Sequence, residues 1–149
     1  MPIPASILER PGALLVIAAR TGQERANARL APLGLSVRMC GVLNLLADQG
    51  PLSQHEIGQL LNIDRTTMVD LIDQLEREGI VKRAPNPQDR RSHAVTLTVT
   101  GKAKQKRAMR AFDGAVEDFF APLSPAERKQ FAQMLRRLLG RQNHVATVT

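Results

Sequence analysis

The residues in this sequence with the clearest chemistry are basic, and they gather in one segment. Between residues 82 and 110, nine lysines and arginines accompany a single acid, Asp89. This segment has a net charge of +8, whereas the whole chain has +7. Such a density of positive charge indicates a polyanionic partner, and nucleic acid is the first candidate. Lysines such as Lys102 to Lys106 also suit a solvated helix face, but Arg90 and Arg91 lie in a turn-rich loop.

Other kinds of chemistry have little support. The sequence has no Gly-x-Ser-x-Gly motif, no glycine-rich phosphate loop and no paired-carboxylate motif. Its three histidines, His55, His93 and His144, lack metal-ligand spacing. The single cysteine, Cys40, lies among apolar residues and is expected to be an inert small hydrophobe, with a redox role as the alternative. We therefore predict a protein that is not an enzyme and needs no metal or cofactor.

Composition narrows the class further. The 149 residues fit one domain, and 43% hydrophobic residues can build a core. Aromatic residues make up 3%, with no Trp or Tyr, which argues against proteins that stack single-stranded bases. The longest apolar run, Ala13 to Ala19, is too short to span a membrane, and the residues before it make a poor signal peptide. We expect a cytoplasmic protein without membrane contact.

The basic loop must be positioned by helices, and several helix N-termini can be recognised by their capping residues. The pattern predicts a helix over residues 12–30 and a second helix capped by Ser36. Residues 53–56 form a capping box that opens a short helix, with Ile57, Leu60 and Leu61 expected to face inward. Asp64 caps a further amphipathic helix that ends at Gly79. Two short helices joined by a tight turn are typical of a helix-turn-helix.

The segment after this pair completes a larger pattern. Residues 80–83 and 94–97 read as strands on either side of the basic loop, so the expected unit is a winged helix. Thr98 can then cap a long basic helix, and residues 124–127 form another capping box before the last helix. That last helix carries a wide apolar stripe, which we expect to pack, together with the first helix, against a second copy of the chain. Packing of the stripe on the core of its own domain is the alternative. The stripe consists of Phe131, Met134, Leu135, Leu138 and Leu139.

The stretch from Leu60 to Gly101 resembles the MarR family of bacterial transcription regulators. The resemblance rests on residues 64–67, 71–76, 79–83, 89–91 and 97–101, and the helix order extends it over nearly the whole chain. It implies a mainly α fold with a small β-hairpin wing, in a single domain over residues 1–149. Residues 36–98 would form the DNA-binding lobe, and residues 10–33 and 99–141 the dimerisation helices. It also implies a homodimer on a pseudo-palindromic promoter site, often a repressor that a small ligand releases.

The resemblance also assigns roles to residues. The N-terminal turn of the recognition helix would meet base edges or phosphates in the major groove, through Arg65, Thr66 and Thr67; a capping role is the alternative for either threonine. At the wing, Arg90 is assigned to the minor groove, Arg91 to a contact with Asp64, and Asp89 to the loop shape, although the two arginine roles are interchangeable. Phosphate contacts are expected from residues near the starts of two other helices: Ser36, Arg38, Ser53, Gln54 and His55.

The residue patterns leave two roles open, that of Asp70 and that of the arginines near the dimer helices. Asp70 stands where many members of the family carry Arg, so it would accept from cytosine N4 or pair with a basic neighbour. An anionic effector would bind arginines near the dimer helices, but ion pairs are the more favoured role for these side chains. The arginines in question are Arg20, Arg25, Arg29 and Arg38.

The sequence thus predicts a homodimeric transcription regulator of the repressor type. We expect it to bind double-stranded DNA, and the resemblance implies a small aromatic or anionic molecule as its effector. The alternatives are a nonspecific or architectural nucleic-acid-binding protein and a winged helix that binds protein.

Overall fold

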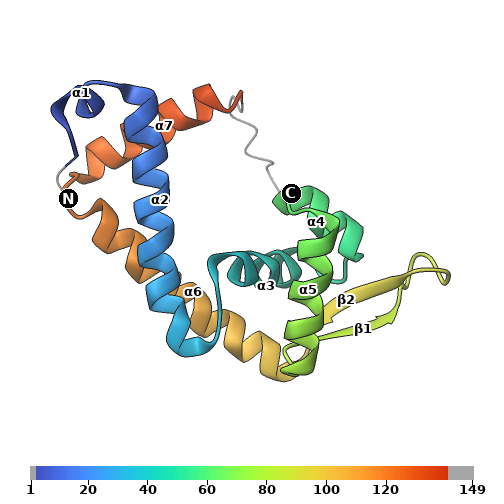
Figure 1. The fold of residues 1–149 in the computed structure, drawn as a ribbon. Helices are drawn as coiled ribbons and strands as arrows, with labels where there is room; N and C mark the ends of the chain where they lie inside the picture. Colours follow the sequence, from blue (N-terminus) through green and yellow to red (C-terminus); the bar gives the residue numbers. More distant parts are fainter. Residues whose placement is uncertain (1–2, 141–149) are drawn as a thin grey trace.

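The computed structural model describes residues 3–140 and is mainly helical. Figure 1 shows two regions joined by the long helix α6, with the wing projecting from the region opposite the N-terminus. The expected end of the dimerisation segment at residue 141, and His144, lie outside the described residues. The helices are α1 (Ala5–Leu8), α2 (Pro11–Leu30), α3 (Val37–Gln49), α4 (Gln54–Leu61), α5 (Arg65–Arg77), α6 (Val99–Phe120) and α7 (Pro125–Leu138), with a 3-10 turn over Ala31–Leu33.

The helices begin where the capping residues predict. The side chains of Ser36, Ser53, Asp64, Thr98 and Ser124 each accept a hydrogen bond from the backbone N–H three residues on. Both predicted capping boxes are complete. The helix end expected at a glycine is also confirmed, since Gly79 follows α5 with a φ of 70°. The single turn α1, which lies between Pro4 and Pro11, was not predicted from the sequence.

The core lies mainly inside the winged-helix lobe and includes the fully buried Leu30, Leu43, Ile57, Ile72 and Leu75. One inward-facing prediction is wrong. Leu60 is 62% exposed, whereas Leu61 packs against the core. The α4 helix has only two turns, and its buried face follows the i, i+4 pair Ile57 and Leu61. Leu60 therefore turns away by about 100°.

The wing is a two-stranded antiparallel sheet, β1 (Val81–Pro85) and β2 (His93–Leu97), with Val81 paired to Leu97 and Pro85 to His93. Both strands extend further towards the tip than the predicted ranges. A bridge between Leu52 and Val95 ties the wing to the turn before α4, with N···O distances of 3.2 and 2.7 Å. The wing is therefore anchored at its base to the helix pair beside it.

Within residues 3–140, no single helix is long and apolar enough to cross a membrane. The segments Pro11–Leu33 and Val37–Gln49 reach the length and apolar composition of a membrane span only when they are taken together, and they are bent by 75° relative to one another.

Candidate nucleic-acid interface

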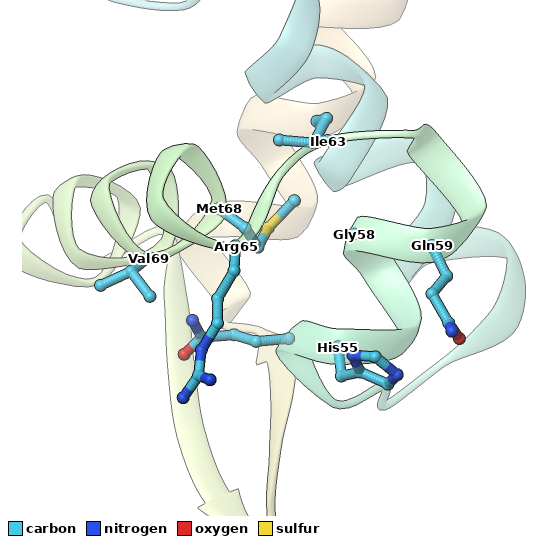
Figure 2. A pocket seen from close by; sticks show the side chains of 8 residues that line it. His55, Gly58, Gln59, Ile63, Arg65, Met68 and Val69 are labelled. Atoms are coloured by element: carbon cyan, nitrogen blue, oxygen red, sulfur yellow. The ribbon is translucent and has the colours of Figure 1, made fainter.

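A hollow of about 800 Å³ lies between α4 and α5. Figure 2 shows Arg65 and His55 approaching its mouth from the first turns of the two helices. Ile63, Met68 and Val69 supply its apolar lining, and the other lining residues are Gln54, Gly58 and Gln59. The structure thus brings together Gln54, His55 and Arg65, three of the residues assigned to DNA in the sequence.

A tight turn sets the geometry of this hollow. Asn62 takes a left-handed conformation (φ 52°), and the Ile63 N–H donates to the Gly58 carbonyl at 2.9 Å. A Cβ at Gly58 would lie 3.0 Å from the Ile63 carbonyl oxygen, so glycine permits this close approach. The first turns of α4 and α5 are thereby held on either side of the hollow. Each first turn presents unpaired backbone N–H groups and the positive end of a helix dipole, which favour an anion.

Thr66 and Thr67, in the first turn of α5, have different surroundings, although the sequence offered both of them a DNA contact or a capping role. Arg65 and Thr66 are exposed. Thr67 is half-buried, and its hydroxyl donates to the Asp64 carboxylate at 2.7 Å while its backbone N–H donates to the same group at 2.9 Å. These two hydrogen bonds lower the pKa of Asp64. The Thr67 side chain therefore serves the cap, whereas Thr66 faces solvent.

At the wing tip, the backbone is shaped by short polar side chains. The Asp89 carboxylate accepts from the Arg91 N–H at 3.0 Å, and the Asn86 side chain accepts from the Gln88 N–H at 3.0 Å. Arg90 and Arg91 are exposed, and neither takes part in an ion pair among residues 3–140. The expected contact of Arg91 with Asp64 is therefore absent among the described residues, where the Asp64 carboxylate accepts from Thr67.

Arg83, and not Arg91, links the wing to the helix-turn-helix. Its guanidinium, on β1, donates to Gln54 of α4 at 2.9 Å and to Asp73 of α5 at 2.5 Å, and it pairs with Glu76 of α5. This one side chain joins the wing to both helices of the helix-turn-helix. In the sequence, Arg83 belongs to the basic segment, to the first predicted strand and to a motif of the family, but no partner was assigned to its side chain. The signal that it missed was the pair of acids, one helical turn apart, just upstream of an arginine in the first strand.

The remaining residues assigned to phosphates divide into two groups. Ser53 caps α4 beside the hollow, and Glu56 completes its capping box. Ser36 and Arg38 lie at the start of α3, where the Val37 N–H donates to the Asn27 side chain of α2 at 2.8 Å. The structure places this end of α3 against α2, and neither Ser36 nor Arg38 lines the hollow.

Known proteins share this arrangement. Residues 38–93 match the MarR family. A putative transcriptional regulatory protein for the hcr operon of Thauera aromatica is 32% identical over 70% of this chain and 63% of its own length, so the chain spans less than two thirds of that relative. An HTH-type transcriptional repressor of Mycobacterium tuberculosis is 30% identical over 89% of this chain and 90% of its own length. This chain belongs to the MarR family.

Solved MarR-family structures have the same fold. CouR from Rhodococcus jostii, bound to p-coumaroyl-CoA, has a TM-score of 0.79 and 26% identity, and the match covers 91% of this chain and 95% of CouR. A single-residue mutant of MarR from E. coli, complexed with operator DNA, has a TM-score of 0.78 and 23% identity, over 86% of this chain and 92% of that protein. The mainly α, winged-helix fold is confirmed. The family and the named relatives are transcription regulators, so the prediction of a non-enzymatic protein is also confirmed.

A second hollow in this MarR-family protein, of about 360 Å³, lies between α2, α6 and α7. Its lining is almost entirely apolar and includes Phe112, Phe119, Phe120 and Phe131. Two of the arginines considered for an anionic ligand are paired instead: Arg20 with Glu24, and Arg29 with Asp118. Arg25 lies over the Phe119 ring, with 5.5 Å between its guanidinium carbon and the ring centroid.

Cys40 is buried in the core of this MarR-family protein, and its sulfur lies 4.0 Å from that of Met109. Burial raises the pKa of the Cys40 thiol, and the negative charge of Asp113 raises it further. Both effects disfavour the reactive thiolate. Among residues 3–140, no group of three or more His, Cys, Asp or Glu side chains is arranged to hold a metal ion.

Proposed function

We propose that this MarR-family protein is a homodimeric repressor that binds a pseudo-palindromic promoter site with one winged helix on each half-site. The observation that carries the proposal is the surface formed by the α4–α5 hollow, with Arg65 at its mouth, together with two wing-tip arginines that lack ion-pair partners within the described chain. Each part of this surface suits a different feature of duplex DNA.

The start of α5 suits the major groove. The exposed Arg65 and Thr66 lie in its first turn, where recognition helices contact base edges. Gln54 and His55 occupy the first turn of α4 across the hollow, and there the helix dipole favours a phosphate. The α4 contacts position the protein and the α5 contacts specify the sequence.

The wing suits the minor groove. Narrow A·T-rich grooves concentrate negative potential and attract arginine. Figure 1 shows the wing tip extending beyond α5, so one lobe can contact two successive grooves. We assign the groove contact to Arg90 or Arg91, both of which have exposed side chains at the tip.

The opposite region of the protomer suits self-association. Of the twelve large apolar side chains that are exposed within residues 3–140, nine lie in the N-terminal segment up to Val16 or in the C-terminal segment from Val116 onward. They include Val16 at 68%, Leu138 at 75% and Leu139 at 72% exposure. Apolar surface gathered in this way marks an interface, and a second copy would cover it symmetrically.

An effector is part of the proposal. The apolar hollow between α2, α6 and α7 is lined by four phenylalanines and suits an aromatic group. The related CouR structure holds p-coumaroyl-CoA, an aromatic thioester. We infer that a small aromatic or anionic molecule releases this protein from DNA.

The first experiment measures fluorescence anisotropy with the intergenic DNA beside the protein's own gene, against a scrambled duplex, at several salt concentrations. We expect at least ~10³-fold tighter binding to the native fragment, and affinity that falls steeply with salt. Equal binding to both duplexes would indicate an architectural protein and contradict the proposal. No binding to either duplex would favour a protein-binding winged helix.

The same assay tests the wing. Arg90→Ala and Arg91→Ala are each expected to weaken operator binding, and loss of the groove contact should cost about 1–3 kcal/mol. Lys129→Ala is the matched control, because it removes the same charge from an exposed position on α7. If both wing variants bind as tightly as the control, the wing assignment is wrong.

A further inference from the structure

We propose that Val69 and Asp70 determine the operator sequence, Val69 by packing on the methyl group of a thymine and Asp70 by accepting from the N4 amine of a cytosine. This inference rests on the proposed function and names the base pairs that α5 reads. The sequence left two roles open for Asp70, a cytosine contact and a basic neighbour, and Val69 was absent from the residues assigned to DNA.

Internal contacts limit which part of α5 is available to DNA. Asp73 and Glu76 are held by Arg83 of the wing, and the Thr67 hydroxyl is held by Asp64. Exposed positions remain in the first two turns: Arg65, Thr66, Val69 and Asp70. From Arg65 to Asp70 the helix rises roughly 8 Å at 1.5 Å per residue, which matches two to three base pairs at 3.4 Å each. These four exposed side chains can therefore contact only two to three successive base pairs.

Val69 is an apolar residue on this otherwise polar surface. It is 37% exposed, although the preceding Met68 is only 2% exposed. Figure 2 shows the Val69 and Arg65 side chains projecting from the same side of α5. In the major groove, the C5 methyl of thymine is the apolar group that such a side chain can contact. An arginine one turn earlier can meanwhile reach guanine or a phosphate.

Asp70 restricts its base by the direction of the hydrogen bond. It is exposed and takes part in none of the ion pairs of residues 3–140. A carboxylate only accepts, so its partner must donate, which excludes guanine and thymine, whose major-groove edges carry acceptors. Adenine offers its N6 amine beside the N7 acceptor, which would repel the second carboxylate oxygen. The cytosine N4 amine has no acceptor on its own base beside it and is the better match.

The experiment begins with the full-length wild-type protein and duplexes selected from a random-sequence pool. The selected half-sites should contain a thymine and a cytosine within three base pairs. Replacing that thymine by deoxyuridine removes the methyl group alone and should weaken binding about fourfold, the equivalent of one buried carbon. This arm requires no variant, so it does not depend on the folding of an altered chain.

Two variants then assign the contacts. Val69→Ala should bind the thymine and deoxyuridine duplexes within twofold of one another. Asp70→Asn can both donate and accept, so the preferred base should change from cytosine to adenine, to which Asn bonds bidentately. Asp48→Asn, the same change at an exposed position on α3, is the control and should keep the wild-type preference.

The outcomes separate this inference from the proposed function. Wild-type protein that selects no sequence would contradict both. Wild-type protein that selects a defined site but is indifferent to deoxyuridine, or an Asp70→Asn protein that keeps the wild-type base preference, would overturn the inference and leave the regulator intact. Loss of deoxyuridine sensitivity in Val69→Ala together with a cytosine-to-adenine switch in Asp70→Asn would establish it.

Discussion

At the scale of single residues, Arg83 links more of the DNA-binding lobe than any other side chain described above. Its guanidinium reaches Gln54, Asp73 and Glu76, and its backbone N–H donates to Glu76 at 3.2 Å. Its side chain is 26% exposed, and those of Asp73 and Glu76 are 49% and 38% exposed. Partial burial makes these charge-assisted bonds stronger than surface pairs, while solvent still screens them.

Arg83→Ala is expected to lower the free energy of unfolding by about 1–2 kcal/mol, a range discounted for this exposure. It should also weaken operator binding, because the wing is no longer joined to α4 and α5. Denaturant unfolding and anisotropy measure the two effects. Lys82→Ala, an exposed neighbour on the same strand, is the charge-matched control. Equal stability of the two variants would show that the Arg83 network contributes nothing measurable.

At the scale of elements, close backbone contacts and capped helix starts define the lobe. The Thr98 N–H donates to the Ile80 carbonyl at 3.1 Å, and the Thr98 hydroxyl donates to the Gly79 carbonyl at 2.6 Å. Gly101, in the first turn of α6, lies against the same Ile80 carbonyl, where a Cβ would overlap the oxygen. The start of α6 is thereby attached to the end of the helix-turn-helix.

Gly101→Ala is expected to cost about 3 kcal/mol or more, since backbone atoms have to move to make room. Gly41→Ala in α3 is the control, because its Cβ would make an ordinary contact of 3.8 Å with Leu61. That control should be neutral or gain up to ~1 kcal/mol from helix propensity. Thermal and denaturant unfolding measure both, and a Gly101→Ala protein as stable as the Gly41→Ala protein would contradict the predicted overlap.

The capping carboxylates make stability depend on pH. Hydrogen bonds from Ser53 lower the pKa of Glu56, those from Ser124 lower the pKa of Glu127, and those from Thr67 lower the pKa of Asp64. A carboxylate whose pKa is lower in the folded than in the unfolded state stabilises the fold at pH values above its unfolded pKa. That contribution is lost as the pH falls through the folded pKa.

Unfolding free energy is therefore expected to decline as the pH drops below about 4, the ordinary range of these groups. The double variant Glu56→Gln/Glu127→Gln should show a shallower decline, because it removes two of the carboxylates whose pKa is lowered in the folded state. Urea unfolding between pH 7 and pH 3 measures the slopes. Parallel slopes for the wild type and the double variant would argue against this origin of the acid sensitivity.

At the scale of the whole molecule, the lobe that binds DNA and the region that carries exposed apolar surface lie at opposite ends of α6 (Figure 1). Asn27 of α2 caps the first turn of α3, and the apolar hollow between α2, α6 and α7 includes Val37 beside that cap. The proposed dimer region is thus bonded directly to the first helix of the lobe. A second copy would set the distance between two recognition helices, and hence the half-site spacing.

Truncation after Leu123 removes α7 and is expected to abolish the dimer. Leu138→Glu in the full chain tests the same surface without deleting an element, since Leu138 is 75% exposed in the protomer and its change leaves the core intact. A chain ending at Gly140 retains α7 and should remain dimeric. Sedimentation velocity measures all three, and dimers of both the truncated and the Leu138→Glu proteins would place the interface elsewhere.

Much of the molecule could be predicted from its sequence, because the signals act over a few residues. The caps at Ser36, Ser53, Asp64, Thr98 and Ser124 are contacts between neighbours three residues apart, and helix periodicity identified most of the core. The basic loop between two strands was equally visible, since turn residues and charge are local properties. These signals were sufficient for the winged helix and for the family.

Only the tertiary structure decided which distant side chains meet. It joined Arg83 of the wing to acids on another element, and among the described residues it left Arg91 without the expected ion pair to Asp64. It also exposed Leu60, and it left Val69 on the surface that we propose meets DNA. Contacts of this kind depend on how whole elements pack, and packing is a property of the assembled core that no short window of sequence contains.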